Sequence, residues 1–424
     1  MEPTRRELIR LLGAGIAGLA AGCGDNTAPD LSSAATAVLE PDPESFLVAV
    51  WTRLGVSEAT IEVRTAGVLM REAPVLLTGG IGAAAIDGLS ADTRYEVTIA
   101  VGDLRLGPHR VRTAPRPDDP RPVRVAISAD ADPSPEFDSG MLDALAAEDP
   151  ELYISIGDFP YTDNGPPAET VPQYRERHVE LRTHPPVRGL LEACGMRAIY
   201  DDHEFRNDWD AHFVALEGDR YAAAMQTWDA FFPLRTTGEI KYRRWRWGAH
   251  LECFLLDCRR FRSANAAPDD AQKTMLGPVQ RRWLIDGVTR SSATFKLVLT
   301  SVPLDHGTGN DHWAAFTTER DAIFAALVGT PGVLFVSGDQ HWFAAHRHAF
   351  GIREVQIGPL ARGLGVPGPM VPGVLYRAER YNAGLVEIDS DRLTLSGLGE
   401  DGLRFYSETV TAADLTPRLA SPPP

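Results

Sequence analysis

Acidic and histidine side chains follow five separate hydrophobic runs of this 424-residue chain, each at the point where the run ends. They are Asp130 after VRVAIS, Asp158 after ELYISIG, Asp202 and His203 after MRAIY, Asp257 after HLECFLL, and Asp339 and His341 after VLFVSG. One aspartate in such a place indicates only a turn. Five of them predict a shared site, because ligands of open α/β sheets bind beyond the carboxyl ends of the strands.

The chemistry of such a site follows from its charge. Carboxylates gathered at one edge repel one another and need cations. Carboxylate oxygens together with imidazoles suit hard or borderline ions such as Ca, Mg, Mn, Fe and Zn. An aspartate shared by two ions holds them about 3.5–4 Å apart, which suits the attacking and leaving oxygens of a displacement at phosphorus. The pattern therefore predicts a metal site; a pair of ions there would suit cleavage of a phosphoester, with a nearby arginine as a planar fork for the phosphate oxygens.

The elements that must position these residues are predicted from residue 116 onward. Strand-like runs alternate there with helical segments such as SGMLDALAAED, DRYAAAMQTWDAFF and PVQRRWLIDGVTRS. This alternation indicates an α/β domain in layers, αββα, over residues 116–424. Residues 380–410 return to a β pattern, and 242–248 (YRRWRWG) predict an exposed edge strand or the wall of a pocket. Cys194 and Cys253 lie in apolar contexts and are expected to be buried.

The segment 31–115 has a different character. Short runs with partial period-two alternation, separated by Gly, Pro and Asp, predict an antiparallel β-sandwich. The stretch GLSADTRYEVTIAV followed by HRVRTAP resembles a fibronectin type III domain, with Leu89 and Tyr95 where that family packs its turn and strand. A proline-rich linker, TAPRPDDPRP, follows.

Residues 1–30 predict export. Arg5 and Arg6 precede an uncharged stretch, 11–24, that is too short to span a bilayer and suits the apolar region of an export signal. The twin arginine resembles the signal of the twin-arginine export machinery. LAAGC resembles a lipoprotein site that would anchor Cys23 to lipid, although Ala20 departs from that pattern. The chain is thus expected in the periplasm or at the cell surface; the alternative is a short N-terminal helix packed on the body.

The net charge of −16 argues against general affinity for nucleic acid or for anionic membranes. An acidic chain still binds anions locally when metal ions cancel its carboxylates. The partner expected from the sequence is therefore a phosphoester substrate rather than a polyanion.

The order of the blocks D-x-D, GD-x-x-Y, DDHE, D-x-R and GD-x-H resembles the calcineurin-like metallophosphoesterases, and within them the PhoD-type alkaline phosphatases. These blocks stand here as DAD, GDFPY, DDHE, DCR and GDQH, and LGPVQRRWLIDGV (276–288) resembles a further helix of that family. The resemblance covers about 123–400. It implies a metal-dependent phosphoric ester hydrolase in which a metal-bound hydroxide attacks phosphorus.

The resemblance also implies the metal ligands, which are Asp130, Asp158, Tyr161, Asp202, Asp339 and His341. Asp158 would bridge two ions. Asp130, His341 and the Tyr161 phenolate would hold one ion, which suits Fe³⁺, while the others would serve a second, for which Ca²⁺ is expected. Asp130 stands where the family often has a cysteine, so another divalent ion is the alternative to iron. Within DAD, Asp132 is the alternative to Asp130 as the ligand.

Among the remaining polar residues, the resemblance implies that His203 donates to the phosphate or leaving group and that Arg259 holds the phosphate. Arg262 is the competing arginine, and either could instead form a structural ion pair. Asp201 and Glu204 are expected to orient their neighbours. His346 and His348 are expected to be structural or exposed, and His306 follows a strand-like run without a clear ligand role.

Two alternative functions stay open at this point. The same ligand set serves phosphodiesterases, phospholipases and nucleotidases. An inactive cell-surface binding protein is the alternative from another class.

Overall fold

The computed structural model describes residues 30–134, 136–235, 238 and 240–419. By its contacts the chain divides into residues 1–30 and a compact unit, 31–424, and the architecture below is that of the second unit. The predicted export signal and Cys23 lie outside the described residues. Within the described ranges, no helix has both the length and the apolar character needed to cross a bilayer.

A nine-stranded mixed sheet runs through the unit. Its order is β20 (Arg404–Thr411), β19 (Arg392–Gly399), β18 (Asn382–Asp389), β8 (Val123–Ser128), β9 (Leu152–Ser155), β10 (Gly195–Ala198), β1 (Ala34–Asp42), β2 (Ser45–Thr52) and β5 (Ile81–Asp87). The central strands β8, β9 and β10 are parallel to one another, and β10 is parallel to β1. The strands flanking this core are antiparallel.

A seven-stranded sheet packs on one part of the first. Its order is β11 (Arg243–Trp247), β12 (Leu251–Leu255), β13 (Phe295–Leu299), β14 (Val333–Ser337), β16 (Arg353–Gln356), β15 (Phe343–Arg347) and β17 (Val374–Ala378). Strands β12, β13, β14 and β16 are parallel. Every residue of β13 and β14 is buried, as expected for parallel strands covered on both faces. The predicted strand within 242–248 is β11, which forms an edge of this sheet and buries Trp245 and Trp247.

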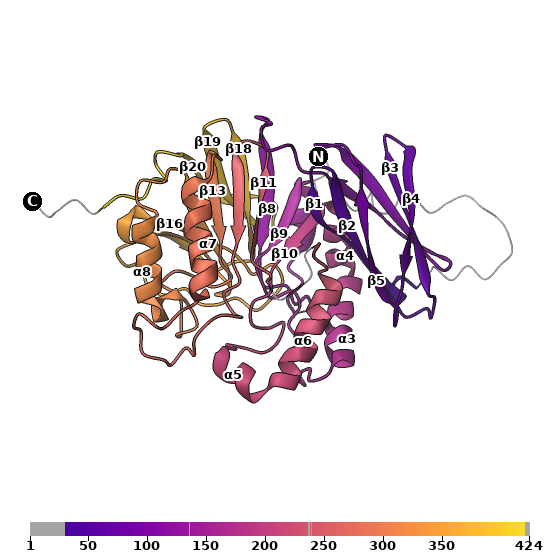
Figure 1. The fold of residues 1–424 in the computed structure, drawn as a ribbon, viewed down its shortest axis with the longest axis horizontal. Coiled ribbons are helices and arrows are strands. Elements are labelled where there is room, and N and C mark those ends of the chain that lie inside the picture. Colours follow the sequence, from indigo (N-terminus) through magenta and orange to yellow (C-terminus); the bar gives the residue numbers. More distant parts are fainter. Residues whose placement is uncertain (1–29, 135, 236–237, 239, 420–424) are drawn as a thin grey trace, which may run out of the picture. The chain divides into compact units, whose positions relative to one another are not determined.

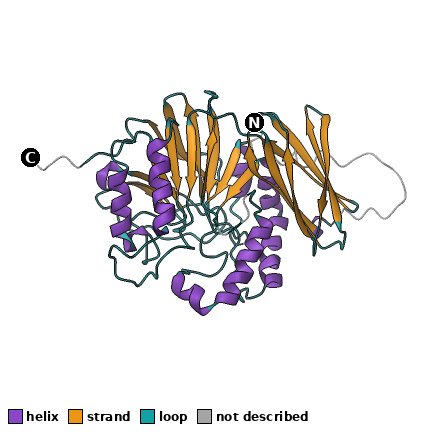
Figure 2. Cartoon of the chain, in the orientation of Figure 1, coloured by secondary structure: helices purple, strands orange, loops and turns teal. Residues whose placement is uncertain are grey.

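Helices cover the outer faces of both sheets, so that the layers run helix, sheet, sheet, helix. Figures 1 and 2 show α7 and α8 beside the seven-stranded sheet, and α3, α4 and α6 on the other side. Apolar clusters fill each gap between layers, including one between the two sheets. This arrangement agrees with the predicted α/β layering. The helices are α2 (Met141–Ala147), α3 (Val171–Thr183), α4 (Pro185–Ala193), α5 (Ala211–Leu216), α6 (Gly218–Phe231), α7 (Gly277–Arg290) and α8 (Thr317–Ala326).

The N-terminal strands form a sandwich that shares a sheet with the rest of the unit. A four-stranded sheet, β4 (Val68–Leu76), β3 (Glu58–Thr65), β6 (Arg94–Val101) and β7 (Leu104–Arg112), packs on β1, β2 and β5 over an apolar core. Strand β6 alternates buried and exposed positions, as a half-buried strand does. Tyr95 accepts a hydrogen bond from the Ser90 amide at 2.9 Å, beside the partly buried Leu89.

Because β1 also pairs with β10, the sandwich is continuous with the central sheet, and the predicted boundary at residues 115 and 116 falls between β7 and β8. The division into two domains and the assignment to fibronectin type III stay predictions. Cys194 and Cys253 are buried free thiols, as expected.

Candidate metal centre

Carboxylates from both large sheets converge at one edge. The loops after β8, β9 and β10 in the first sheet and after β13 and β14 in the second bring donor atoms together in overlapping groups, within each of which they lie 4.8 Å or less apart. These groups are Asp130, Asp158 and His341; Asp158, Asp202 and His203; Asp201, Asp202 and Asp339; and Asp202, Asp208 and Asp311. Asp158 belongs to two groups and Asp202 to three, which is the arrangement that bridging ligands need.

The backbone at this edge is held in an uncommon conformation. Asp130, Asp158, Asp339 and His341 all have positive φ, from 57° to 76°, a region that non-glycine residues rarely adopt. Such conformations cluster at functional sites, where the surrounding structure enforces them. Gly358 leaves the space this requires, because a Cβ there would lie 2.2 Å from Asp130 Oδ2.

Asp130, Tyr161 and His341 form the first part of the centre. Asp130 is 1% exposed, and neither of its carboxylate oxygens has a hydrogen-bond partner among the described residues. His341 Nε2 lies 3.7 Å from Asp130 Oδ1 and 2.8 Å from Tyr161 Oη. The other nitrogen of His341 is 2.7 Å from the Gly363 carbonyl oxygen, which fixes the ring and directs Nε2 inward.

Asp158 and His203 form the second part. The His203 amide donates to Asp158 Oδ1 at 3.2 Å, and His203 Nδ1 pairs with Asp163 at 2.7 Å. The His203 and Tyr161 rings stack with centroids 4.1 Å apart. Glu204 accepts hydrogen bonds from the amides of Asp158, Phe159 and Asp201, at 2.8–3.1 Å. It orients the loops that carry the other carboxylates, the role expected from its place in DDHE.

Asp201 and Asp202 have different partners although they are neighbours. Arg259 binds Asp201 with two nitrogens, at 2.6 and 2.8 Å, and also binds Asp311 at 2.6 Å. Asp202 Oδ2 accepts from the Asp208 amide at 2.6 Å, while its buried Oδ1 has no hydrogen bond and lies 3.7 Å from Arg259. Asp202 thus presents one free oxygen to the centre, whereas Asp201 is committed to the arginine.

The carboxylates of the centre have the shifted pKa values expected where buried negative charges outnumber the cations beside them. Burial, reinforced by Asp201 and Asp202, raises the pKa of Asp130 well above its usual value of 3.8, and burial with Asp202 does the same to the pKa of Asp158. Burial also raises the pKa of Asp339, to which Asp201 and Asp202 add. Burial opposes protonation of His203, but Asp202 and Asp163 outweigh it and raise its pKa to about 9. Burial lowers the pKa of His341 to about 4, so this ring stays neutral and able to bind a metal.

The structure brings all six predicted metal ligands and His203 to this edge. Arg259 has surroundings other than those predicted for a phosphate-binding residue. It is 0% exposed and forms ion pairs with Asp201 and Asp311, which is the alternative role that the sequence left open. Arg262 is equally buried and pairs with Asp311. Asp257 is 0% exposed and accepts from Tyr200 at 2.5 Å.

Arg362 is a residue that sequence reasoning missed. Its guanidinium lies over the Tyr161 ring, 4.8 Å from the centroid, and its side chain is 23% exposed. It donates to Asn164 at 2.7 Å and lies 3.5 Å from Asp132. Arg362 follows β16, which is parallel to β14. A search for polar residues after each hydrophobic run would have found it at the end of REVQIGPLAR.

His346 and His348 do not contribute to this centre. Both are buried side chains paired with Glu354, which excludes the exposed alternative. The ring of His306 lies 5.0 Å from that of His346, so His306 too belongs to that group rather than to the centre.

The fold is shared with solved phosphatase structures. The solved structure of PhoD superposes with a TM-score of 0.80 over 94% of this chain and 94% of its own, at 16% identity. The purple acid phosphatase PPD1 of yellow lupin (Lupinus luteus) gives a TM-score of 0.68 over 92% of this chain and 77% of its own, at 12% identity. Fold and site together define a protein of the metallophosphoesterase class.

The chain belongs to the PhoD-like phosphatase family, whose sequence model matches residues 139–360, more than half of the chain. Alkaline phosphatase D of Bacillus subtilis (strain 168) is 23% identical over 307 residues, which cover 60% of this chain and 52% of that protein. The matched region therefore spans about half the length of this curated relative. The family predicted from the five blocks is confirmed.

Proposed function

We propose that the chain is a metal-dependent phosphoric ester hydrolase. One observation carries this proposal most directly. Asp130 is buried, neither of its oxygens has a hydrogen-bond partner among the described residues, and its donor atoms lie within 4.8 Å of those of Asp158 and His341. A buried carboxylate without a partner is costly unless a cation completes its surroundings. The donor set of carboxylates, one imidazole and a phenol fits such a cation.

The residues that would hold the metals fall into two sets. Asp130, Tyr161 and His341 would hold one ion, which suits Fe³⁺ because of the phenol oxygen. Asp202 and Asp339 would hold the second, for which oxygen ligands favour Ca²⁺. Asp158 would contribute to both. When bound, these ions would neutralise the phosphate charge and lower the pKa of a water molecule that attacks phosphorus.

The chain's own residues would position the substrate. His203 has its Nδ1 held by Asp163, so its other nitrogen is directed elsewhere. It is suited to donating a proton to the leaving oxygen. Arg362 is half-buried beside Tyr161 and offers its guanidinium to a phosphate oxygen, a part that the enclosed Arg259 is less suited to play.

The experiment that tests this proposal combines metal analysis with hydrolysis of a simple aryl phosphate. Asp158→Ala should abolish hydrolysis and lower the metal content, whereas Asp391→Ala, at an exposed turn, should change neither. Retained hydrolysis in Asp158→Ala would refute the proposed centre. Wild-type chain that binds no metal and cleaves neither a monoester nor a diester would favour the binding-protein alternative.

Export and lipid anchoring at Cys23 remain predictions from residues 1–30. Labelling of the expressed chain with a radioactive fatty acid, in wild type and in Cys23→Ser, would test the anchor. Labelling that persists in Cys23→Ser would contradict it.

A further inference from the structure

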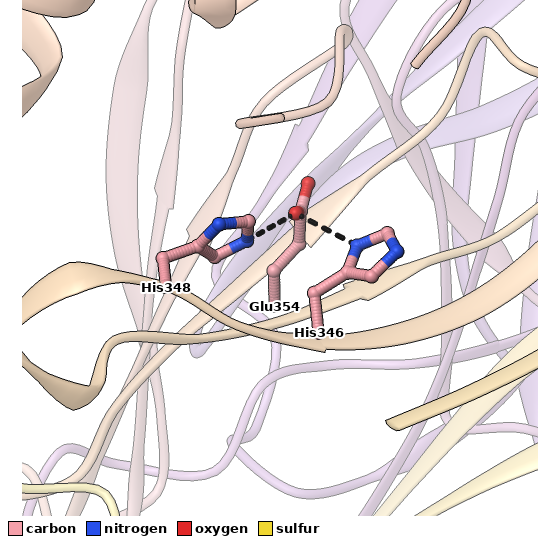
Figure 3. Close-up of side chains that lie close together, drawn as sticks. All are labelled: His346, His348 and Glu354. Carbon is pink, nitrogen blue, oxygen red and sulfur yellow. Dashed lines mark hydrogen bonds and ion pairs between the residues drawn. The ribbon is translucent and has the colours of Figure 1, made fainter. Parts of the chain in front are cut away.

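A second group of potential metal ligands lies in the seven-stranded sheet. Figure 3 shows His346 and His348 pointing at one carboxylate oxygen of Glu354, and we call these three residues the His–Glu cluster. His346 on β15 stands directly opposite Glu354 on β16 in the antiparallel register, and His348 follows two residues later. His348 lies just beyond the end of β15, in extended backbone, and its ring reaches the same carboxylate.

The ligand atoms of the three side chains all lie within 4.8 Å of one another, close enough to hold one ion. Glu354 Oε2 lies 3.2 Å from His346 Nδ1 and 2.7 Å from His348 Nε2, and His346 and Glu354 are both 0% exposed. The other carboxylate oxygen, Oε1, accepts from the Leu304 amide at 2.8 Å and from Ser337 Oγ at 2.6 Å. Hydrogen bonds that fix one oxygen of a carboxylate while the other faces two imidazoles are the usual support of a metal-binding carboxylate.

The charge of the cluster points the same way. Among the described residues, the ion pairs of Glu354 are those with His346 and His348, and neither imidazole carries a charge unless it is protonated. The buried carboxylate therefore has hydrogen bonds on both oxygens but no permanent cation beside it among these residues. A bound divalent cation would supply that charge at any pH at which the imidazoles are neutral.

A third histidine lies beside the cluster. The ring of His306 lies 5.0 Å from that of His346 and 5.7 Å from that of His348, so a third imidazole faces the other two. The buried Nε2 of His346 has no hydrogen-bond partner in the described part of the chain. No second hydrogen bond locks that ring, which can adjust to a cation.

We propose that His346, His348 and Glu354 form a zinc site separate from the candidate metal centre. Two imidazoles and one carboxylate are a common protein donor set for Zn²⁺, with His306 or water as the fourth ligand. The cluster shares no residue with the four groups of the centre. Bound zinc would tie β15 to β16 and, through Ser337, hold the end of β14, from which Asp339 follows two residues later.

The test uses amide substitutions that keep the hydrogen bonds but bind zinc poorly. In His348→Gln the amide nitrogen replaces Nε2, and in His346→Asn it replaces Nδ1, so each variant still offers a donor to Glu354. The full chain is stripped with chelator, equilibrated with Zn²⁺ alone and analysed by mass spectrometry. Both variants should bind about one zinc ion fewer than wild type. His212→Gln, at an exposed histidine of α5, is the matched control and should bind as many as wild type.

A second arm separates this site from the candidate metal centre. Asp158→Ala, loaded with Co²⁺, should retain the visible absorption of a four-coordinate cobalt site, and Asp158→Ala combined with His348→Gln should lose it. If His348→Gln does not fold, His346→Asn carries the same comparison. Equal zinc content in wild type, His348→Gln and His346→Asn would overturn the proposal and leave the cluster a buried hydrogen-bond network.

Discussion

Arg259 is the residue for which the sequence and the structure suggest different consequences of substitution. If the guanidinium held substrate phosphate, Arg259→Met would raise KM and leave the fold intact. In the structure the same guanidinium makes two contacts with Asp201 and one with Asp311, all within 2.8 Å, and is 0% exposed. Its loss would leave the buried Asp201 carboxylate without its cation, while Asp311 would keep Arg262.

The magnitude follows from the cost of breaking a buried ion pair. Removing one partner of such a pair destabilises proteins by about 3–5 kcal/mol, because the other charge stays buried and uncompensated. We therefore expect Arg259→Met to lower the free energy of unfolding by about that amount. Arg259→Lys keeps the charge but not the planar fork, so a smaller loss of about 1–2 kcal/mol is expected.

The measurement is equilibrium unfolding in urea, with chelator present so that metal binding does not contribute. Far-ultraviolet circular dichroism and tryptophan fluorescence should report the same midpoint shift. The reasoning would be refuted if Arg259→Met unfolded with a free energy within about 0.5 kcal/mol of wild type and had a raised KM. Arg259 would then be a substrate-binding residue.

Three further predictions concern the candidate metal centre and one buried histidine. Arg362→Met should raise KM for an aryl phosphate by about tenfold to a hundredfold, which corresponds to the loss of one charge-assisted hydrogen bond, and should leave stability unchanged. An unchanged KM would exclude contact between Arg362 and the phosphate. Asp130 has a raised pKa in the folded chain, so without metals stability falls as pH rises above 3.8, and Asp130→Asn should stabilise the chelated chain at pH 8 by at least about 1 kcal/mol. A destabilised Asp130→Asn would show that the carboxylate has a partner. Burial lowers the pKa of His109 from 6.5 to about 4. The contribution of the neutral ring to the free energy of unfolding is therefore complete above pH 6.5, and about 3 kcal/mol of it is lost as the pH falls to 4. His109→Gln should remove that part of the pH dependence of stability, as measured by urea unfolding.

The sequence by itself determined the family, the layered α/β class and which acidic and histidine residues would meet at one edge. This was possible because the carboxyl ends of parallel strands lie at one edge of a sheet, so aspartates and histidines that follow such strands come together there. Asp130, Asp158 and His341 could thus be grouped before any contact was known. Strand β11 and the buried Cys194 and Cys253 followed from local apolar pattern in the same way.

Only the tertiary structure decided which charges face one another. Arg259 and Arg362 each follow a strand, and nothing local distinguishes them; one is enclosed by Asp201 and Asp311, and the other lies half-buried over Tyr161. The pairing of β1 with β10 likewise depends on a contact between segments more than 150 residues apart. The same holds for His346 and Glu354, whose meeting is set by the register of β15 on β16. Burial and partner choice are properties of the packed chain, and they separate an arginine enclosed by two carboxylates from one that stays half-buried at the centre.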